Sequence, residues 1–590
     1  MRLPRFAPFL LCALTLGCGQ SSDNAQAEFS LLLTDAASDE LAVFEVDVTG
    51  AVLHRAGGAD VSALTSPVRV DFVELEQLSD LIVGGTLPAG FYRGLTLTLD
   101  FTNAIVCLHD QSSHATVVDS SGNPITGAID VEVTFGSASR PQLIARRNHL
   151  WTLDLDLDQS LAIDSANNRV TFTPVLAATV DFTNAKPARI QGALGTVDTG
   201  GRTFLVQKLS TSNTVIAPYT VRTSTTTLFQ IDGVVSIGDA GLGALASRAN
   251  LGPRVFVQGT INSTDRVLEA TAVETGYGVP GNGQDWIVGH VTARTGAAGG
   301  DATLTVLGQS LDVGTTTRRF NTSHTVNVVR GQTLVLKRGL ESPFGTDDLN
   351  VGQIVMVFGD MTGTTMDAGS AANGVARMLP TSVFGIANGS VSNNTLTLDV
   401  TRFDLRDASV FDFTVAATSE ADPDAYTIDT TGLVTTGITL NSRVRAIGFV
   451  NAVGVPADAN FTAVSLVDRT AAARVLLCQW APAQAVTPTT TSSSVSFDVS
   501  QALIKAVGDG FAPVVLQNSP EPAIEPAAAR GLFAITQARA TELHLTFSSF
   551  VTALNGKLTS GLKVVRISAV GTFDNTTQVT TAGIANFVVQ

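Results

Sequence analysis

Alternating apolar and polar residues recur along most of this chain, and they limit its fold more than any other feature. Every second residue is apolar in Leu95–Phe101, and similar alternation appears in Phe44–Val48, Ile129–Phe135 and Leu153–Asp158. Because successive side chains of a strand point to opposite faces, this pattern predicts strands with one face on a core and the other in water. Turn-forming Gly, Asn and Asp residues separate these segments. We therefore expect an all-β protein built from sandwich or barrel units.

Helical periodicity is confined to two short segments. Phe72, Leu75, Leu78 and Ile82 follow the spacing of one helix face, and a second helix is expected within Thr541–Leu554. Helices should therefore form only a small part of the structure.

The length and composition of the chain exclude several classes of protein. At 590 residues the chain is long enough for several domains, and a hydrophobic content of 44% is too high for a disordered protein. No apolar run reaches the roughly 18 residues that a membrane-spanning helix requires. The net charge of −16 argues against nucleic acid or an acidic membrane surface as a partner, because both attract basic proteins.

The N-terminus resembles the leader of a bacterial lipoprotein. Arg2 and Arg5 precede a short apolar stretch that runs from Phe6 to Leu16, as in a secretory signal peptide. The following Leu-Thr-Leu-Gly-Cys sequence, which ends at Cys18, resembles the lipobox of that family. The resemblance implies that residues 1–17 are removed and that Cys18 is the lipid attachment site, with acyl chains such as palmitate on its thiol and amine. An ordinary signal peptide that leaves Cys18 unmodified is the alternative.

Residues 18–28 are polar and lack any hydrophobic period, so we expect a flexible tether. Gly19 stands where an aspartate would favour retention at the inner membrane, so resemblance to the enterobacterial sorting pattern implies the outer membrane. Loss of Arg2 and Arg5 with the leader changes the net charge to −18. The sequence therefore predicts an acidic body held in the cell envelope by a lipid anchor, facing the periplasm or the surface.

Residues 29–182 resemble a domain found in bacterial lipoproteins. The resemblance rests on Leu31–Asp39, on Val70–Leu75 and Leu87–Tyr92, and on the closing segments Leu155–Ser160 and Thr173–Leu176. Their order and spacing are similar to those of domain of unknown function 4382. That family implies an exported β-rich domain, which we expect to be a β-sandwich, and it implies no activity.

A repeated unit of nearly 100 residues follows. Its most similar segments are three nonapeptides that each end in glycine, namely Leu251–Gly259, Val351–Gly359 and Leu440–Gly448. An opening strand with its own glycine precedes each nonapeptide, and we assign Gly192, Gly289 and Gly389 to these positions, with spacings of 97 and 100 residues. The units resemble domain of unknown function 5666, and we expect small five-stranded barrels of the OB type. Glycine at the same strand end in every copy fits a barrel corner.

A fourth, degenerate copy is expected at the C-terminus, because Gly571–Val579 parallels Gly259–Val267 in residue type. Linker-like insertions at Thr487–Ser494 and Asn518–Pro526 leave the limits of this copy open. The expected order is a leader (1–17), a tether (18–28), a sandwich (29–182), barrels at 186–276, 285–384 and 385–470, and the degenerate copy at 471–590.

Motifs that would indicate catalysis are weak. Gly276, Gly278 and Gly281 spell GxGxxG, but Pro280 and further glycines replace the helix that a dinucleotide site requires, so a linker is expected. The SxxK sequence at Ser560–Lys563 lacks its companion motifs and is interpreted as a turn. The sequence contains no GxSxG, HExxH, CxxC or Walker A motif. We therefore expect no catalytic residues and no cofactor.

Two groups of residues have the chemistry of metal ligands. Cys107 and His109 would share one face of a strand, with His114 nearby for a transition metal, but no fourth ligand is evident, and a buried thiol with an exposed histidine is the favoured interpretation. Asp154, Asp156 and Asp158 on one strand, and Asp35, Asp39 and Glu40 in a loop, could bind Ca²⁺ or could form a solvated face. We assign no metal site. A disulfide between Cys107 and Cys478 is possible in an exported protein.

Together these features indicate a non-enzymatic, lipid-anchored protein of the cell envelope with a structural or interaction role. The expected body is an acidic, elongated string of β-domains. The alternative is a binding module for a polysaccharide, a peptide or calcium at the cell surface. The expected partners are the membrane, through the lipid, and an envelope polymer or protein.

Overall fold

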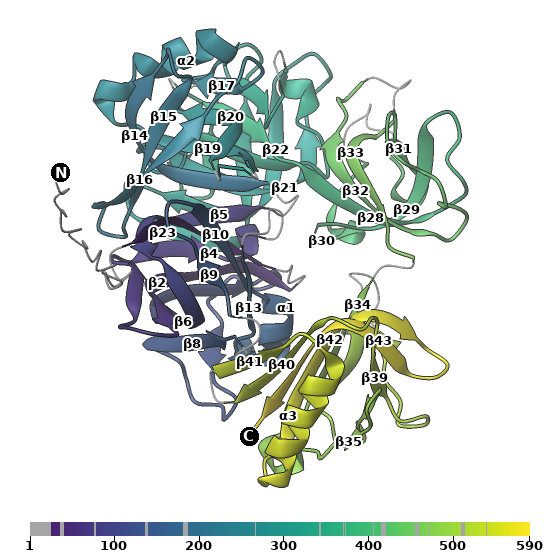
Figure 1. Ribbon diagram of the computed structural model, residues 1–590. Helices are drawn as coiled ribbons and strands as arrows, with labels where there is room; N and C mark the ends of the chain where they lie inside the picture. Colours follow the sequence, from purple (N-terminus) through teal and green to yellow (C-terminus); the bar gives the residue numbers. More distant parts are fainter. Residues whose placement is uncertain are drawn as a thin grey trace, which may run out of the picture.

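The computed structural model describes residues 25–590 except 36–39, 76–77, 136–139, 181–186, 263, 266, 341–343, 370, 372, 405, 415–420, 455–458, 471–472, 509–513 and 538–539. The protein is mostly β, as the alternation predicted (Figure 1). Among the described helices only α2 (Gly238–Ala246) and α3 (Phe547–Thr559) are longer than a single turn. No helix in this described part combines the length and the hydropathy needed to cross a membrane.

The N-terminal unit consists of two larger sheets that enclose one core, and of a small third sheet that contributes to the same core, with the order β11 (Leu161–Asp164), β12 (Arg169–Phe172) and β7 (Thr116–Val118). The first sheet has the order β13-β10-β1-β5 and the second the order β3-β2-β6-β8. Trp151 lies at the centre of the core, with its ring centroid 5.8 Å from that of Phe29 and 6.0 Å from that of Tyr92. The strands of the two larger sheets are β1 (Gln26–Thr34), β2 (Leu41–Arg55), β3 (Val61–Leu64), β4 (Val68–Asp71), β5 (Ser79–Pro88), β6 (Gly90–Leu108), β8 (Ala128–Thr134), β9 (Gln142–Leu143), β10 (Asn148–Leu155) and β13 (Leu176–Val180).

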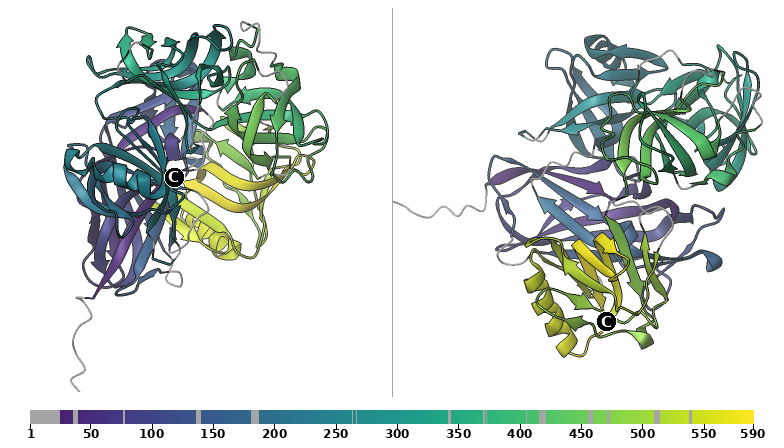
Figure 2. Two further views of the ribbon diagram at one scale, coloured as in Figure 1. Left: turned by 90° about the horizontal axis from the view of Figure 1, so that it is seen from above. Right: turned by 90° about the vertical axis from the view of Figure 1, so that its right-hand side faces the viewer.

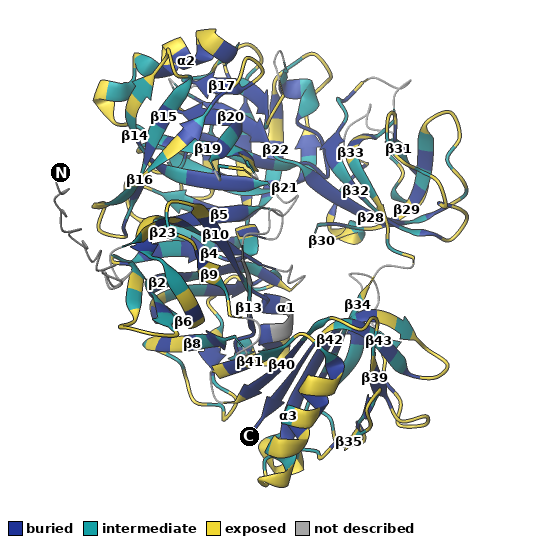
Figure 3. Cartoon of the chain, viewed as in Figure 1, coloured by how far each residue is buried: buried dark blue, intermediate teal, exposed yellow. Residues whose placement is uncertain are grey.

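The helix expected at residues 72–82 was wrong. Val73–Leu75 forms one 3₁₀ turn, and β5 begins at Ser79, because this segment pairs with the edge of β1 and the pairing overrides helical spacing. The second expected helix exists but begins later, at Phe547. Thr546 caps it, because its hydroxyl accepts a hydrogen bond from the Ser549 backbone N–H. Figure 3 shows the exposed outer side of this helix, and its buried side includes Phe550.

The repeated units share one pattern of strand pairing. In each of the first three units, five strands pair in a closed ring in which the first strand contacts the fourth and the third runs parallel to the fifth. The structure contains a small five-stranded β-barrel of this kind. The first ring consists, in order of pairing, of β14 (Ala188–Asp198), β15 (Thr203–Leu209), β16 (Val215–Arg222), β20 (Leu268–Thr275) and β19 (Arg254–Ile261). The second ring consists of β21 (Asp285–Thr295), β22 (Ala302–Asp312), β23 (Thr317–Val328), β26 (Thr365–Asp367) and β25 (Ile354–Thr362). The third ring consists of β28 (Thr381–Ala387), β29 (Thr395–Phe403), β31 (Tyr426–Asp429), β33 (Phe461–Asp468) and β32 (Arg443–Val450).

The opening glycine recurs at the same position of each repeated unit for a steric reason. The same reason corrects the assignment of this glycine in the third unit. A Cβ atom on Gly192 or on Gly289 would lie 2.3 Å from a carbonyl oxygen of the second strand, and one on Gly385 would lie 2.6 Å from the carbonyl oxygen of Asp399. These three glycines also pair with the same position of the fourth strand. Gly389 lies beyond the end of β28, so its assignment as the opening glycine was wrong. The spacings from Gly192 are therefore 97 and 96 residues, and the third unit begins at Thr381.

Substitution of Gly385 by alanine is expected to lower the free energy of unfolding by about 1–3 kcal/mol, because the new methyl group would overpack against the backbone of β29. Gly389→Ala serves as the control, since a Cβ there meets nothing within 4 Å, and its effect should stay within about 0.5 kcal/mol. Urea unfolding followed by circular dichroism measures both values. A larger loss for Gly389→Ala than for Gly385→Ala would restore the original assignment.

The C-terminal unit repeats this pattern in part. β34 (Arg474–Gln479) pairs with β37 (Ile504–Gly508) and with β42 (Val564–Asp574), and β42 pairs with β43 (Val579–Val589). Gly571 lies at a shift of register, as Gly259 and Gly448 do, and a Cβ on it would lie 2.1 Å from the Thr581 carbonyl oxygen. In the described strands of this unit the ring is open, because β38 (Val514–Val515) and β39 (Ala523–Pro526) do not pair with each other.

The expectation of an elongated string was wrong, because both ends of the series of repeats join the N-terminal unit. β5 pairs in parallel with β14, so the first sheet continues into the first repeat. β8 pairs in parallel with β41 (Ala540–His544), so the second sheet continues into the C-terminal unit. Figures 1 and 2 show the purple N-terminal unit between these two neighbours. Pairing with a neighbour protects strand edges that would otherwise be free to aggregate.

Candidate functional site

The lipid attachment residue Cys18 lies outside the described residues. Part of the segment predicted as a tether is a strand. Residues 26–28 belong to β1, where they pair with β5, so the tether assigned to 18–28 was wrong over its last three residues. Alternation of exposed and buried residues begins at Gln26, where the polar composition had hidden it.

The residues considered for a transition metal do not converge. Cys107 is fully buried, and its thiol donates a weak hydrogen bond to the Ser113 carbonyl oxygen at 3.8 Å. Burial raises the pKa of this thiol to about 12, so it remains protonated and is a poor ligand. The His109 ring lies beside the Glu40 carbonyl oxygen, and the His114 ring packs against Phe320. Within the described parts of the chain no three His, Cys, Asp or Glu side chains are placed to hold a metal ion.

The aspartates considered for calcium do not line one strand face. β10 ends at Leu155, and Asp158 belongs to the helical turn α1 (Leu157–Ser160), so the strand predicted through residue 158 was wrong. The strand gives way to a turn here because Asp35 accepts a hydrogen bond from the Leu157 backbone N–H at 2.8 Å. Asp35 and Asp156 are buried rather than solvated. Asp39 and the side chain of Asp158 lie outside the described residues.

Cys107 and Cys478 are both buried and free, so the structure contains no disulfide between them. The GxGxxG segment connects β20 with β21. Gly276, Gly278 and Gly281 all have positive φ angles, which is typical of a succession of turns.

The structure brings together one set of polar side chains that sequence reasoning missed. On the outer face of β2 and β6, His54 Nδ1 lies 2.8 Å from Asp60 Oδ2, and His54 Nε2 lies 2.7 Å from Thr96 Oγ1. The hydrogen bond from His54 lowers the pKa of Asp60. This order of groups can activate a hydroxyl nucleophile. However, Glu132 pairs directly opposite Thr96, so a carboxylate would lie close to any oxyanion that formed there. The arrangement is better suited to holding the two strands together.

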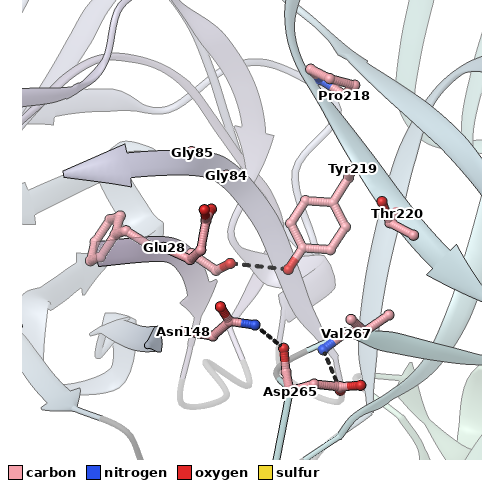
Figure 4. Close-up of a pocket in the computed structure, with 11 residues that line it drawn as sticks. Glu28, Gly84, Gly85, Asn148, Pro218, Tyr219, Thr220, Asp265 and Val267 are labelled. Carbon is pink, nitrogen blue, oxygen red and sulfur yellow. Dashed lines mark hydrogen bonds between the residues drawn. The ribbon is translucent and has the colours of Figure 1, made fainter. Parts of the chain in front are cut away.

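A pocket of about 370 Å³ lies where the N-terminal unit meets the first repeat (Figure 4). Glu28, Ser30 and the Gly84–Gly85 pair contribute one wall, and Tyr219 of β16 contributes the opposite wall. Asn148, and Asp265 from the loop between β19 and β20, close one end. The pairing of β1 with β5 and of β5 with β14 brings these segments together.

Tyr219 is the central side chain of this pocket. Its hydroxyl lies 3.1 Å from the hydroxyl of Ser30, and its ring leaves no space for a side chain at Gly84. Burial raises the pKa of Tyr219, so its hydroxyl stays neutral and able both to donate and to accept hydrogen bonds.

Asp265 is fixed within the pocket wall by its neighbours. Its carbonyl oxygen accepts a hydrogen bond from Asn148, and its carboxylate pairs with Arg222 and accepts a hydrogen bond from the Val267 backbone N–H at 3.2 Å. The hydrogen bond from Arg222 lowers the pKa of Asp265, which therefore stays ionised. The Gly84–Gly85 pair was the only local signal of this pocket, and nothing in the sequence connected it with Tyr219.

Comparison with known proteins adds no family assignment. No family model matches the chain, and no curated protein matches it.

Proposed function

We propose that this chain is a lipid-anchored extracytoplasmic protein with a non-enzymatic role in the cell envelope. In this proposal the N-terminal unit is a β-sandwich and the repeats are OB-like barrels. The strand order of the rings, with the first strand beside the fourth and the third parallel to the fifth, supports the OB relationship. The leader that ends at Cys18 supports export and attachment to the outer membrane.

The observation that carries a scaffold role is the way in which the units are joined. Two joints are continuous sheets, and a third contains Glu274 buried between Arg338 and Arg377. Joints of this kind hold units in one relative position, whereas flexible linkers would let them move independently. Such a body suits presentation of a fixed surface near the membrane.

Substitution of Cys18 by alanine is expected to abolish lipidation and to release the protein from the membrane fraction. Cys12→Ala is the matched control, because Cys12 lies within the removed leader and its loss should leave attachment unchanged. Metabolic labelling with an alkyne fatty acid, followed by fractionation of the two membranes, measures both effects. Unchanged labelling of the Cys18→Ala variant would overturn the anchor.

Ligand binding is a second candidate function, and the pocket around Tyr219 is the observation that favours it. Binding would add a recognition role to the scaffold without requiring any chemical reaction.

A further inference from the structure

We propose that one end of the N-terminal unit is a contact surface for a bilayer that contains anionic lipids; this rests on the lipid anchor proposed above and adds the surface by which the body meets the membrane. The end concerned is the one at which β1 begins. Four exposed arginines and two exposed apolar residues gather there, and we call them the basic surface: Arg93, Arg140, Arg146, Arg147, Phe91 and Ile144.

Main-chain pairing brings the basic surface to the start of β1. Gln26, the first residue of β1, pairs with Pro88 of β5, and its carbonyl oxygen accepts a hydrogen bond from the Arg146 backbone N–H at 2.9 Å. β6 begins two residues after Pro88, and its Phe91 pairs with Gln142 of β9. A turn then leads from β9 into β10, which runs parallel to β1 and starts at the same end. Segments from five strands therefore meet here.

The charge of the basic surface is opposite to that of the whole chain. No acidic residue occurs between Asp80 and Asp100 or between Glu132 and Asp154, and these two segments supply all four arginines. The net charge of −16 describes the chain as a whole and not this end of it. Because salt screens charges beyond about 8–10 Å, a membrane responds to the charges nearest to it, and basic residues there attract anionic headgroups.

Two carboxylates lie close to these arginines but leave most of the positive charge uncompensated. Asp60 lies 3.7 Å from Arg93. Glu28 is exposed, two residues into β1. The other three arginines of the basic surface form no salt bridge with any carboxylate in the described part of the chain. Their guanidinium groups are therefore accessible to the phosphates of lipid headgroups.

The turn that carries Arg146 does not need an arginine. Arg146 has a φ of 59°, a left-handed conformation that glycine and asparagine adopt more readily than arginine does. The turn is closed by main-chain atoms, because the Arg147 backbone N–H donates to the Ile144 carbonyl oxygen at 3.2 Å. The exposed side chain of Arg146 therefore contributes charge to the surface and not stability to the turn.

The apolar side chains favour a lipid surface over a soluble polyanion. Phe91 is 52% exposed and Ile144 is 41% exposed. Phe91 and Arg93 lie on either side of the buried Tyr92, so both point to the outer face of β6. Proteins that bind at a membrane surface place apolar side chains into the interface beside basic ones. A chain of phosphates would offer Phe91 no apolar environment.

The short segment before β1 keeps this end of the body near the bilayer. Eight residues, 18–25, precede β1, and even fully extended they span at most about 29 Å. If Cys18 carries the lipid, the start of β1 cannot lie farther than this from the membrane. Position and charge therefore favour the same partner, the anionic headgroups of the anchoring membrane.

The test uses the full mature chain, residues 18–590, with the substitution Cys18→Ala, so that no acyl chain contributes to binding. Cosedimentation compares vesicles of phosphatidylcholine with vesicles of phosphatidylcholine and phosphatidylglycerol, and soluble polyphosphate serves as a competitor. We expect at least tenfold stronger partition to the mixed vesicles at low salt. Most of this difference should disappear in about 1 M NaCl, where charges are screened beyond about 3 Å.

Arg146→Asn is expected to weaken partition to the mixed vesicles about fivefold, because one basic residue near an anionic surface contributes about this factor. Arg202→Asn is the matched control, since Arg202 also has a positive φ, of 52°, and both substitutions remove one charge from a turn. Arg202 pairs with Asp239 of α2, which Figure 1 shows on the side of the first repeat away from the N-terminal unit. Replacing Arg146 and Arg147 together should weaken partition about 25-fold.

Equal partition to the two kinds of vesicle, equal losses for Arg146→Asn and Arg202→Asn, or binding of polyphosphate in preference to vesicles would each overturn the proposal. Fatty-acid labelling of Cys18 in the unsubstituted protein measures the anchor separately. Failure of the basic surface is therefore distinguishable from failure of the lipid anchor.

Discussion

Replacing Glu274 with glutamine is expected to lower the free energy of unfolding by about 3–5 kcal/mol. Glu274 lies at the joint between the first and second repeats, and only 3% of its side chain is exposed. Its carboxylate lies 3.2 Å from Arg338 Nε and 3.4 Å from Arg377 Nη1. Burial alone would raise the pKa of Glu274, but these two arginines outweigh burial and hold the pKa below its ordinary value. Glutamine would leave the cation of Arg377 buried without a counter-charge.

The control is Glu269→Gln. Glu269 lies in β20, as Glu274 does, and its exposed carboxylate pairs with Arg222. Its effect should be less than about 1 kcal/mol, because water screens exposed ion pairs. Guanidinium unfolding followed by tryptophan fluorescence measures the first transition of each variant. Equal small losses for both variants would show that the buried pair does not stabilise the joint.

Charged residues account for much of what the sequence could not predict. Only 15% of the residues are charged, and alternation placed them on solvated strand faces. The structure instead buries several of them at joints: Lys208 and Arg189 meet Asp80 between the N-terminal unit and the first repeat. Such contacts depend on which strand edges meet, and periodicity within one strand carries no information about its neighbour in another unit.

Local features were easier to predict than contacts between units. The strand at Leu95–Phe101 could be recognised from its alternation of residue types, and Gly259 and Gly448 could be recognised from their repeated position. Close approach of neighbouring backbones explains why glycine is required at both positions. The position of the third opening glycine was misjudged because Gly385 and Gly389 are equally good local candidates, and only pairing with β32 separates them. The pocket around Tyr219 was missed for the same reason, since two units contribute its walls.

Stability should also depend on pH through a buried histidine of the second repeat. His324 lies in β23 and is fully buried. Burial lowers its pKa, because the charged imidazolium would lose its hydration, and the nearby Arg319 lowers the pKa further. Below a pH of about 6.5 the unfolded chain therefore binds a proton that the folded chain does not bind. Stability falls as the pH decreases, by up to about 1.4 kcal/mol per pH unit, until the folded state is protonated as well.

Substitution of His324 by leucine is expected to remove this contribution to the pH dependence below about pH 6.5. The carboxylates with lowered pKa values, such as Glu274, lose their contribution only at more acidic pH. Burial raises the pKa of Asp71 to about 7, so its contribution has the opposite sign in the same range, and comparison with the unsubstituted protein cancels it. His544, whose pKa is also lowered by burial, should retain its own dependence until it too is replaced. His114→Leu is the matched control, because this histidine is exposed. Urea unfolding at half-unit pH intervals measures the slope of the free energy of unfolding against pH. An unchanged slope in the His324→Leu variant would contradict the prediction, because this substitution removes one titratable side chain and changes no other.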